Sequence, residues 1–257
     1  RAAAAGGFTA VCTMPNTDPP IDDPATVGFV AAEGRRAGAA RVYPVGCISA
    51  GRKGERLALV GEMVEAGAVA ITDDGNPVMD SGLMRLALLY AQAFGIPVAD
   101  HPEDLGLSGR GHMNAGLVST RLGLPGKPNA AEDIHIVRDL LLAELTGGRI
   151  HLQHVSTRFG VESIRQAKAR GVRVTAEASP HHLILTEEAV EGYRTEAKMN
   201  PPLADIPVQL GQLLVELAYF EPDPQHFRFF QRADRRLRRT MAQRRQPRHQ
   251  VMFQSLQ

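Results

Sequence analysis

Residues 84–101 read MRLALLYAQAFGIPVADH and contain one complete repeating unit of the chain. The first eleven of these residues carry apolar side chains at three- and four-residue spacing, which predicts a helix. Gly95 follows at the position where a left-handed residue would end that helix. Ile96–Asp100 is a short, nearly all-apolar run, which predicts a strand buried on both faces. The carboxylate of Asp100 and the imidazole of His101 stand where that strand ends.

The same order of helix, glycine and strand recurs on both sides of this unit. Six strands are predicted: Phe8–Met14, Arg41–Cys47, Ala68–Thr72, Ile96–Asp100, Arg149–Gln153 and Val172–Ala176. Helices are predicted between them, over Pro24–Ala37, Leu57–Ala66, Met84–Phe94, Ala131–Leu145 and Val161–Arg170. Because alternating strands and helices form right-handed βαβ units, the sequence predicts a parallel sheet. Six strands agree both with a (β/α)8 barrel short of two strands and with an open doubly wound sheet.

The composition is that of an ordinary globular protein. The 257 residues are 44% hydrophobic and 22% charged, which excludes disordered and collagen-like chains. Two cysteines are too few for a disulfide framework, so we expect a reducing, cytoplasmic environment. No stretch offers the roughly 20 consecutive apolar residues of a membrane span, and no membrane partner is expected.

The end of the chain differs from the rest in charge. Residues 226–257 hold nine Arg against one acid, a formal charge of +8, so residues 1–225 carry −7 of the net +1. We therefore divide the chain into an α/β part, residues 1–203, and a basic Arg-rich tail, residues 204–257. The tail is a genuine extension, a basic arm or a segment read out of frame, and we favour the last. Nucleic acid is not expected as a partner because no aromatic stacking platform accompanies the Arg residues.

Polar side chains follow the predicted strands at the point where each strand ends. They are Asn16, Asp73, Asp74, Asp100, His101, His154, Glu177, His181 and His182. The carboxyl ends of parallel strands meet at one edge of a sheet, where α/β barrels place their active sites. Imidazole nitrogen and carboxylate oxygen are zinc ligands, so the pattern favours metal-assisted hydrolysis. Adjacent strand residues point to opposite faces, so the sequence does not choose between Asp73 and Asp74. Turn chemistry for that pair and core roles for the histidines stay as alternatives.

These polar residues belong to motifs that occur in the order and spacing of a known family. The motifs are Met14-Pro15-Asn16-Thr17, Asp73-Asp74-Gly75, Asp100-His101-Pro102-Glu103-Asp104, Arg121-Leu122-Gly123-Leu124-Pro125-Gly126, His154-Val155-Ser156-Thr157, Glu177-Ala178-Ser179-Pro180-His181-His182-Leu183 and Lys198-Met199-Asn200-Pro201-Pro202-Leu203. Through them, residues 1–203 resemble the Asp-bridged bacterial type of dihydroorotase, in the zinc amidohydrolase superfamily. The resemblance implies an incomplete (β/α)8 TIM-type barrel of the metal-dependent hydrolase kind, with strands 2–7 present.

The resemblance also implies an activity and residue roles. The reaction is the reversible hydrolysis of dihydroorotate, a cyclic amide, to N-carbamoyl-L-aspartate in pyrimidine biosynthesis. Asp74, His101 and His154 would be metal ligands, with Asp74 bridging two zinc ions and both histidines on the second ion. Asn16 and Asn200 would bind the substrate.

Two motifs of that family are not found in this sequence. They are an H-x-H strand and an A-T-D-H-A-P-H strand, which supply the other metal ligands and the catalytic Asp. We therefore expect at most one zinc, no retained catalytic residue and no activity from the chain as written.

Two other functions are alternatives to that reading. One is a non-catalytic homologue that serves as a scaffold for aspartate carbamoyltransferase. The partner expected is then that enzyme, or alternatively a second copy of this chain in a homodimer. The second is a related allantoinase or dihydropyrimidinase, in which a carbamylated Lys typically stands where this chain has Asp74. No Lys lies between Lys53 and Lys127, which favours the dihydroorotase branch.

Overall fold

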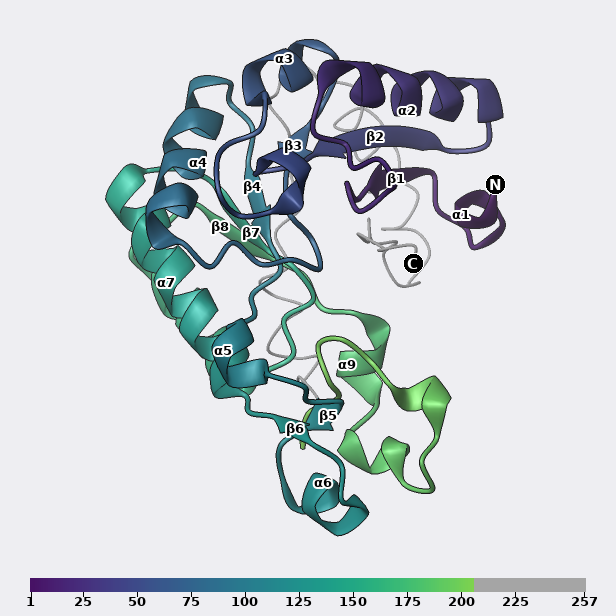
Figure 1. Ribbon diagram of the computed structural model, residues 1–257, viewed down its shortest axis with the longest axis vertical. Helices are drawn as coiled ribbons and strands as arrows, with labels where there is room; N and C mark the ends of the chain where they lie inside the picture. The colour runs from purple at the N-terminus through teal and green to yellow at the C-terminus, as the bar shows by residue number, and fades with distance from the viewer. Residues whose placement is uncertain (206–257) are drawn as a thin grey trace, which may run out of the picture.

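A computed structural model of the protein describes residues 1–205, so the predicted tail lies outside the described residues from 206 onward. The described part is built around a six-stranded sheet (Figure 1). Its strands are β1 (Ala10–Thr13), β2 (Arg41–Gly46), β3 (Ala70–Ile71), β4 (Val98–Asp100), β7 (Ile150–Leu152) and β8 (Val174–Ala176). Each of the six predicted strands is present, in every case shorter than predicted.

The strands are all parallel and lie in the sheet in the order β1-β2-β3-β4-β7-β8. Spatial order therefore follows chain order without a reversal. A doubly wound sheet reverses its order at a switch point, whereas successive strands of a barrel are neighbours throughout. The predicted incomplete barrel is confirmed, and the doubly wound alternative is wrong.

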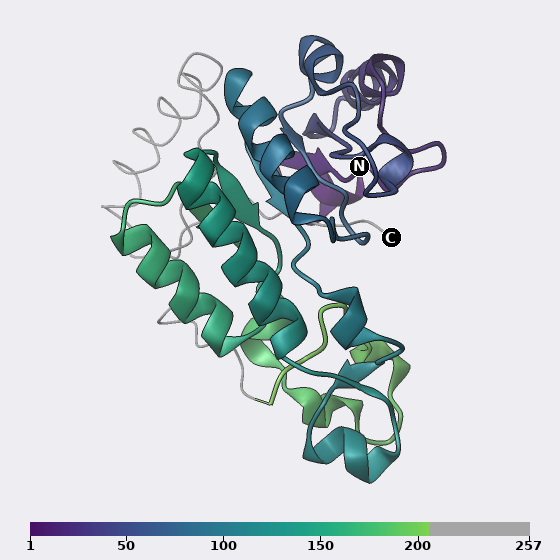
Figure 2. The same ribbon diagram turned by 60° about the vertical axis from the view of Figure 1, so that its left-hand side comes forward.

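Five helices cover one face of this sheet (Figures 1 and 2). They are α2 (Pro24–Ala37), α3 (Val60–Glu65), α4 (Ser81–Ala93), α7 (Ala130–Thr146) and α8 (Arg158–Ala169). Helix α2 begins where Asp23 accepts hydrogen bonds from the backbone N–H groups of Ala25 (2.7 Å) and Thr26 (2.9 Å). Helix α7 ends at Gly147, with φ 68°, a conformation that costs glycine little. No helix within residues 1–205 is long and apolar enough to cross a membrane.

Alternate strand residues serve two separate cores. Along β4, Val98 packs into the large core beneath the helices, and Asp100 faces the same side, where it approaches α7. The opposite, inner face carries a smaller apolar cluster of Met14, Val45 and Ala70. This period of two places His101, the residue after β4, on the inner side.

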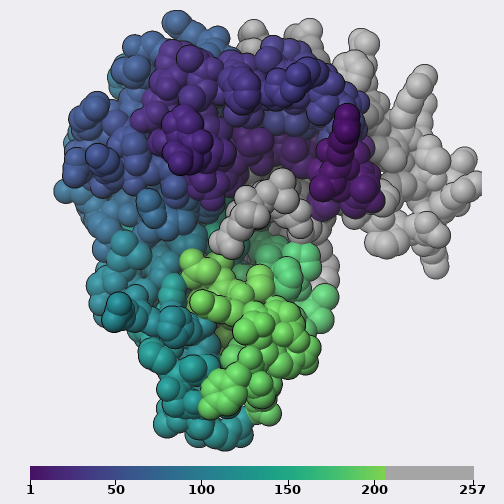
Figure 3. All heavy atoms as spheres, turned by 45° about the vertical axis from the view of Figure 1, so that its right-hand side comes forward, coloured from purple at the N-terminus to yellow at the C-terminus, as the bar shows by residue number. Residues whose placement is uncertain are grey.

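A small lobe lies below the sheet in Figure 1 and is formed by two segments that are far apart in sequence. Its first part contains α5 (Leu105–Ser108), β5 (Met113–Asn114), α6 (Leu117–Leu122) and β6 (Gly126–Lys127). Its second part contains α9 (Pro180–Ile184) and the 3-10 helices η2 (Glu187–Val190) and η3 (Thr195–Ala197). The two parts share an apolar cluster and a 2.6 Å hydrogen bond from Asn114 to Glu187, and they pack together as one projection (Figure 3). The remaining short helices are α1 (Ala2–Ala5) and η1 (Ala50–Arg52), both near the start of the chain.

Candidate metal centre

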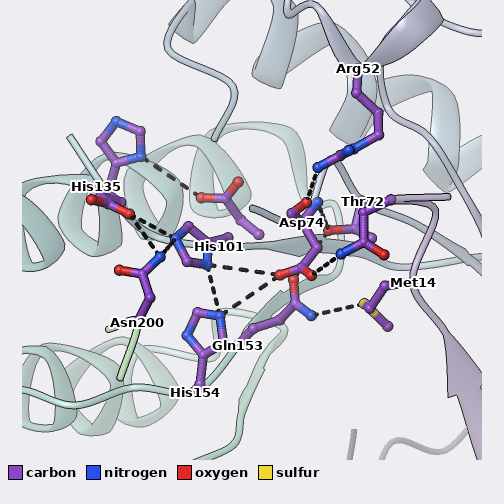
Figure 4. A network of polar contacts seen from close by, with 12 residues as sticks. Met14, Arg52, Thr72, Asp74, His101, His135, Gln153, His154 and Asn200 are labelled. Atoms are coloured by element: carbon purple, nitrogen blue, oxygen red, sulfur yellow. Dashed lines mark hydrogen bonds and ion pairs between the residues drawn. The ribbon is translucent and has the colours of Figure 1, made fainter. Parts of the chain in front are cut away.

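Three side chains from three neighbouring strand ends converge on one point (Figure 4). Asp74, His101 and His154 follow β3, β4 and β7, and each offers a ligand atom within 4.8 Å of the others. His101 Nδ1 lies 2.8 Å from His154 Nε2, and each of these nitrogens lies 3.8 Å from Asp74 Oδ1. The family resemblance implied these three residues as metal ligands, and the structure brings them together. We call them the inner cluster.

The backbone turns His154 towards this point. Strict alternation after Leu152 and Gln153 would direct residue 154 to the helix side of the sheet. Instead His154 has φ 35°, a left-handed conformation that costs a non-glycine residue on the order of 1–3 kcal/mol and often marks functional sites. The following turn is tied down by Glu132, whose carboxylate accepts the N–H groups of Ser156 (2.8 Å) and Thr157 (3.0 Å).

The structure separates the roles of the two adjacent carboxylates. Asp73 accepts hydrogen bonds from the backbone N–H groups of Ile48 (2.8 Å) and Ser49 (3.1 Å) and from the Ser49 hydroxyl. Burial raises the pKa of Asp73, although these hydrogen bonds oppose the change. Its oxygens are thus occupied in holding the loop after β2, and Asp74 is the carboxylate that faces the histidines.

Asp74 is buried but remains an anion. Burial alone would raise its pKa, yet the neighbouring imidazoles of His154 and His101, each 3.8 Å away, and the charge of Arg52 outweigh burial and lower the pKa. Its backbone N–H donates to Thr72 Oγ1 (3.1 Å), and Thr72 in turn donates to Gln153 Oε1 (3.1 Å). The carboxylate is therefore ionised and held in place at neutral pH.

Both predicted substrate-binding residues lie at this cluster. Asn16 Nδ2 is 3.5 Å from Asp74 Oδ2, and Asn200 Nδ2 is 3.4 Å from His101 Nε2. Two further residues were given no role by the sequence. Glu103 accepts from His101 Nε2 (2.9 Å), and Lys127, at the end of β6, donates to Glu103 and to Asn200 Oδ1 (2.8 Å). Glu103 stands two residues after His101 in the motif Asp100-His101-Pro102-Glu103-Asp104, and this spacing could have indicated that it contacts His101. No sequence feature indicated that Lys127 lies at the cluster.

The other polar residues at the strand ends do not join the inner cluster. Asp100 points to the helix side. His182 is buried and bonded to Ser179 Oγ (2.9 Å) and to the Pro201 carbonyl (2.9 Å), and burial lowers its pKa to about 4. His181 is exposed, and Glu177 lies 3.7 Å from His151 Nε2. His182 thus links α9 to the segment that carries Asn200.

The donor set and spacing of the inner cluster fit a zinc ion. Ligands at about 2.0 to 2.1 Å in a tetrahedron lie about 3.3 Å from one another, and the observed separations of 2.8 and 3.8 Å bracket this value. The two ring nitrogens face each other and the carboxylate, and Arg52 binds the backbone carbonyl of Asp74 instead of its carboxylate. Two imidazoles and one carboxylate would leave a fourth position open, as in catalytic zinc sites.

Comparison with known proteins adds two kinds of similarity. The family model described as dihydro-orotase-like matches residues 1–160. The dihydroorotase of Pelobacter propionicus is 58% identical over 205 residues, which cover 80% of this chain and 48% of that protein. The dihydroorotase of Anaeromyxobacter sp. (strain K) is also 58% identical, covering 79% and 47%. The chain spans about half the length of the curated relatives it matches.

Solved structures share the fold at lower identity. The L-hydantoinase (dihydropyrimidinase) from Arthrobacter aurescens matches with a TM-score of 0.64 and 23% identity, over 82% of this chain and 48% of that protein. A D-hydantoinase structure matches with a TM-score of 0.61 and 22% identity, over 79% and 46%. These similarities support the arrangement of parallel strands and covering helices.

Proposed function

This chain belongs to the dihydro-orotase-like family, and from that premise we propose that its candidate metal centre is that of a cyclic amide hydrolase of the dihydroorotase type, with no turnover expected from the chain as written. The proposed reaction interconverts dihydroorotate and N-carbamoyl-L-aspartate in pyrimidine biosynthesis. The proposal includes a cytoplasmic location, which is supported by two cysteines, Cys12 and Cys47, that are free thiols. A second copy of the chain or an aspartate carbamoyltransferase as a partner stays a prediction.

The observation that carries this proposal is the convergence of Asp74, His101 and His154 on one point. Zinc bound there would supply Lewis-acid activation of water and of an amide carbonyl. The protein's own groups supply the rest: Asp74 stays ionised at neutral pH, and the two imidazoles keep their ring nitrogens directed at the same point. In this proposal Asn16, next to Asp74, and Asn200, next to His101, hold the polar atoms of a small cyclic amide.

The alternatives fit these observations less well. A carbamylated lysine of the dihydropyrimidinase kind has no candidate at the cluster, because Lys127 pairs with Glu103 and Asn200. A non-catalytic scaffold would have no need of three converging ligand atoms. We therefore retain the hydrolase as the proposed function.

Zinc binding and hydrolysis test the proposal separately. We expect the chain as written to bind about one zinc, and His101→Ala or His154→Ala to weaken binding by at least about 100-fold, beyond the 10–100-fold typical for residues that only support a ligand. Chelator competition measures the zinc affinity, and a chain that binds no zinc would refute the proposal.

The unaltered chain should turn over dihydroorotate no faster than the His101→Ala variant does. Robust turnover that is lost in the variant would confirm the activity and show that our expectation of an incomplete site is wrong.

A further inference from the structure

Glu103 and Lys127 connect the inner cluster to the lobe. Glu103 Oε2 lies 2.9 Å from His101 Nε2, and Lys127 Nζ binds Glu103 Oε1 and, at 2.8 Å, Asn200 Oδ1. The side chains of Glu103 and Lys127 are only 12% and 17% exposed, so solvent screens this ion pair less than it would a surface pair. Figure 4 shows Asn200 beside His101, on the side opposite Asp74.

Glu103 fixes which nitrogen of His101 is available to a metal. An ionised carboxylate only accepts hydrogen bonds, so His101 Nε2 must carry the proton in this contact. The lone pair of a neutral His101 then sits on Nδ1, the atom that faces His154 and Asp74. A carboxylate that orients a ligand histidine in this way also makes it a stronger ligand.

Lys127 fixes the amide of Asn200 in the same manner. An ammonium group only donates, so the Asn200 atom next to Nζ must be the oxygen. The NH2 group of Asn200 consequently faces Glu103 Oε2, at 3.5 Å, and the His101 ring. Asn200 therefore presents its N–H donors, and not its oxygen, beside His101, which suits a carbonyl or carboxylate oxygen on a ligand that reaches this side of the ring.

We propose that Glu103 and Lys127 are positioning residues that act as one charged clamp: the clamp sets the metal-binding nitrogen of His101 and presents Asn200 as a hydrogen-bond donor. The inference rests on the proposed function, because it needs a metal at the inner cluster. It goes beyond that function by making the lobe, through Lys127 at the end of β6, part of the metal site.

Zinc affinity of the chain tests the clamp, measured by competition with a chromophoric chelator. We expect Glu103→Gln to weaken zinc binding by about tenfold or more, and Lys127→Met to weaken it to a smaller extent. Loss of a cation near a divalent metal should by itself tighten binding, so weakening distinguishes positioning from charge. The double variant should bind no more weakly than Glu103→Gln, because Lys127 acts through Glu103. Arg110→Met, which removes an exposed charge, is the control and should bind as the unaltered chain does.

A second readout follows the amide of Asn200. In protein labelled with 15N-asparagine, the side-chain NH2 signals of Asn200, assigned by their loss in Asn200→Ala, should shift in Lys127→Met and stay in place in Arg110→Met. Should Lys127→Met not fold, Lys127→Gln replaces it with the same expected directions. Zinc binding that is unchanged or tighter in the Lys127 variant, or unshifted Asn200 signals, would overturn the clamp. An unaltered chain that binds no zinc would instead refute the proposed function.

Discussion

Two buried polar clusters lie on opposite faces of the sheet, on either side of the end of β4. His101 belongs to the inner cluster, with Asp74 and His154. The preceding residue, Asp100, belongs to an outer cluster beneath α7, which we define as Asp100, His135, Arg138 and Asp139. Both clusters combine carboxylate and imidazole groups, and both are largely closed to solvent. They differ in what occupies the space between those groups.

In the outer cluster that space holds a guanidinium group. Arg138 Nη2 lies 2.7 Å from Asp139 Oδ1 and 3.7 Å from Asp100 Oδ2, and Arg138 Nη1 donates to the Val78 carbonyl (2.6 Å). Burial raises the pKa of Asp100 to about 6 and that of Asp139 well above its ordinary value. His135 Nδ1 is 3.9 Å from Asp100 Oδ2. The cluster carries its own cation and ties α7 to the sheet.

The inner cluster directs three ligand atoms at one point, and the guanidinium group beside it, that of Arg52, donates to the backbone carbonyl of Asp74 and not to the carboxylate. Arg138 has no lone pair to offer a metal, and it already compensates the outer carboxylates. The comparison therefore teaches that residue types alone do not define a metal site. What distinguishes the inner cluster is that its three ligand atoms, one carboxylate oxygen and two ring nitrogens, lie within 4.8 Å of one another.

The largest expected effect is the loss of the outer cation. Arg138→Met leaves Asp100 and Asp139 buried without compensation, and removal of one partner from a buried ion pair typically costs about 3–5 kcal/mol. Urea denaturation should show a loss of unfolding free energy in that range. Because Arg138 lies on the other face of the sheet, the folded variant should bind zinc as the unaltered chain does. A folded Arg138→Met that has lost zinc binding would contradict the separation of the two clusters.

The next effect is a pH dependence of the outer cluster. Burial first, and then the charge of Arg138, lower the pKa of His135 to about 4 from an ordinary 6.5; the carboxylates of Asp139, Asp104 and Glu103 oppose this change. The unfolded state therefore binds more protons between pH 4 and 6.5, so this residue contributes stability above pH 6.5 that is lost as the pH falls to 4.

His135→Gln removes that contribution. The difference in unfolding free energy between the unaltered chain and the variant should thus favour the unaltered chain more at pH 7 than at pH 4.5, by up to about 3 kcal/mol. Urea titrations at both pH values measure it. The pH dependence that Asp100 contributes runs the opposite way, because its raised pKa stabilises the folded state at low pH. Asp100 is present in both the unaltered chain and His135→Gln, so the difference in unfolding free energy between these two proteins is the informative quantity. A difference that does not change with pH would show that His135 is not held neutral.

The repeating units of the sheet could be predicted because several signals agree there. In residues 84–101, helical periodicity, a terminating glycine and an apolar run all indicate the same βα repeat, and Gly95 has the expected positive φ of 68°. The strands are nevertheless shorter than predicted. Apolar residues such as Ile96 continue into the core before and after the paired segment, so an apolar run predicts burial better than it predicts strand pairing.

The lobe and the fine geometry of the site could not be predicted in the same way. Elements as short as β5 and β6 have no periodicity to detect, so Lys127 could not be placed next to Glu103. The position of His154 depends on a left-handed backbone that no sequence pattern specifies. For Asp73 and Asp74, the alternation of strand side chains predicted that the two carboxylates point to opposite sides. Which of them faces the histidines depends on the hydrogen bonds of Asp73 with the loop at Ile48 and Ser49, and no sequence pattern specifies these.

The pair Asp73 and Asp74 therefore supplies the smallest and sharpest comparison, because the same substitution is made at neighbouring positions. Asp73→Asn replaces one acceptor oxygen by an NH2 group that meets the N–H and O–H donors of Ile48 and Ser49, and leaving such buried donors without an acceptor costs about 1–3 kcal/mol. Asp74→Asn removes a charge whose carboxylate contacts are longer, at 3.8 Å from the two imidazoles and 3.5 Å from the N–H of Asn16, with Arg52 bound to the Asp74 backbone carbonyl, so its stability should change less. Zinc binding should show the reverse order: Asp74→Asn should lose zinc binding, because an amide is a poor substitute for a zinc carboxylate, and Asp73→Asn should keep it.

Urea denaturation of both variants ranks their stabilities, and chelator competition ranks their zinc affinities. If Asp73→Asn lost zinc and Asp74→Asn lost stability, the assignment of Asp74 to the metal would be wrong, since the carboxylate that holds the loop and the carboxylate that faces the histidines would have exchanged roles.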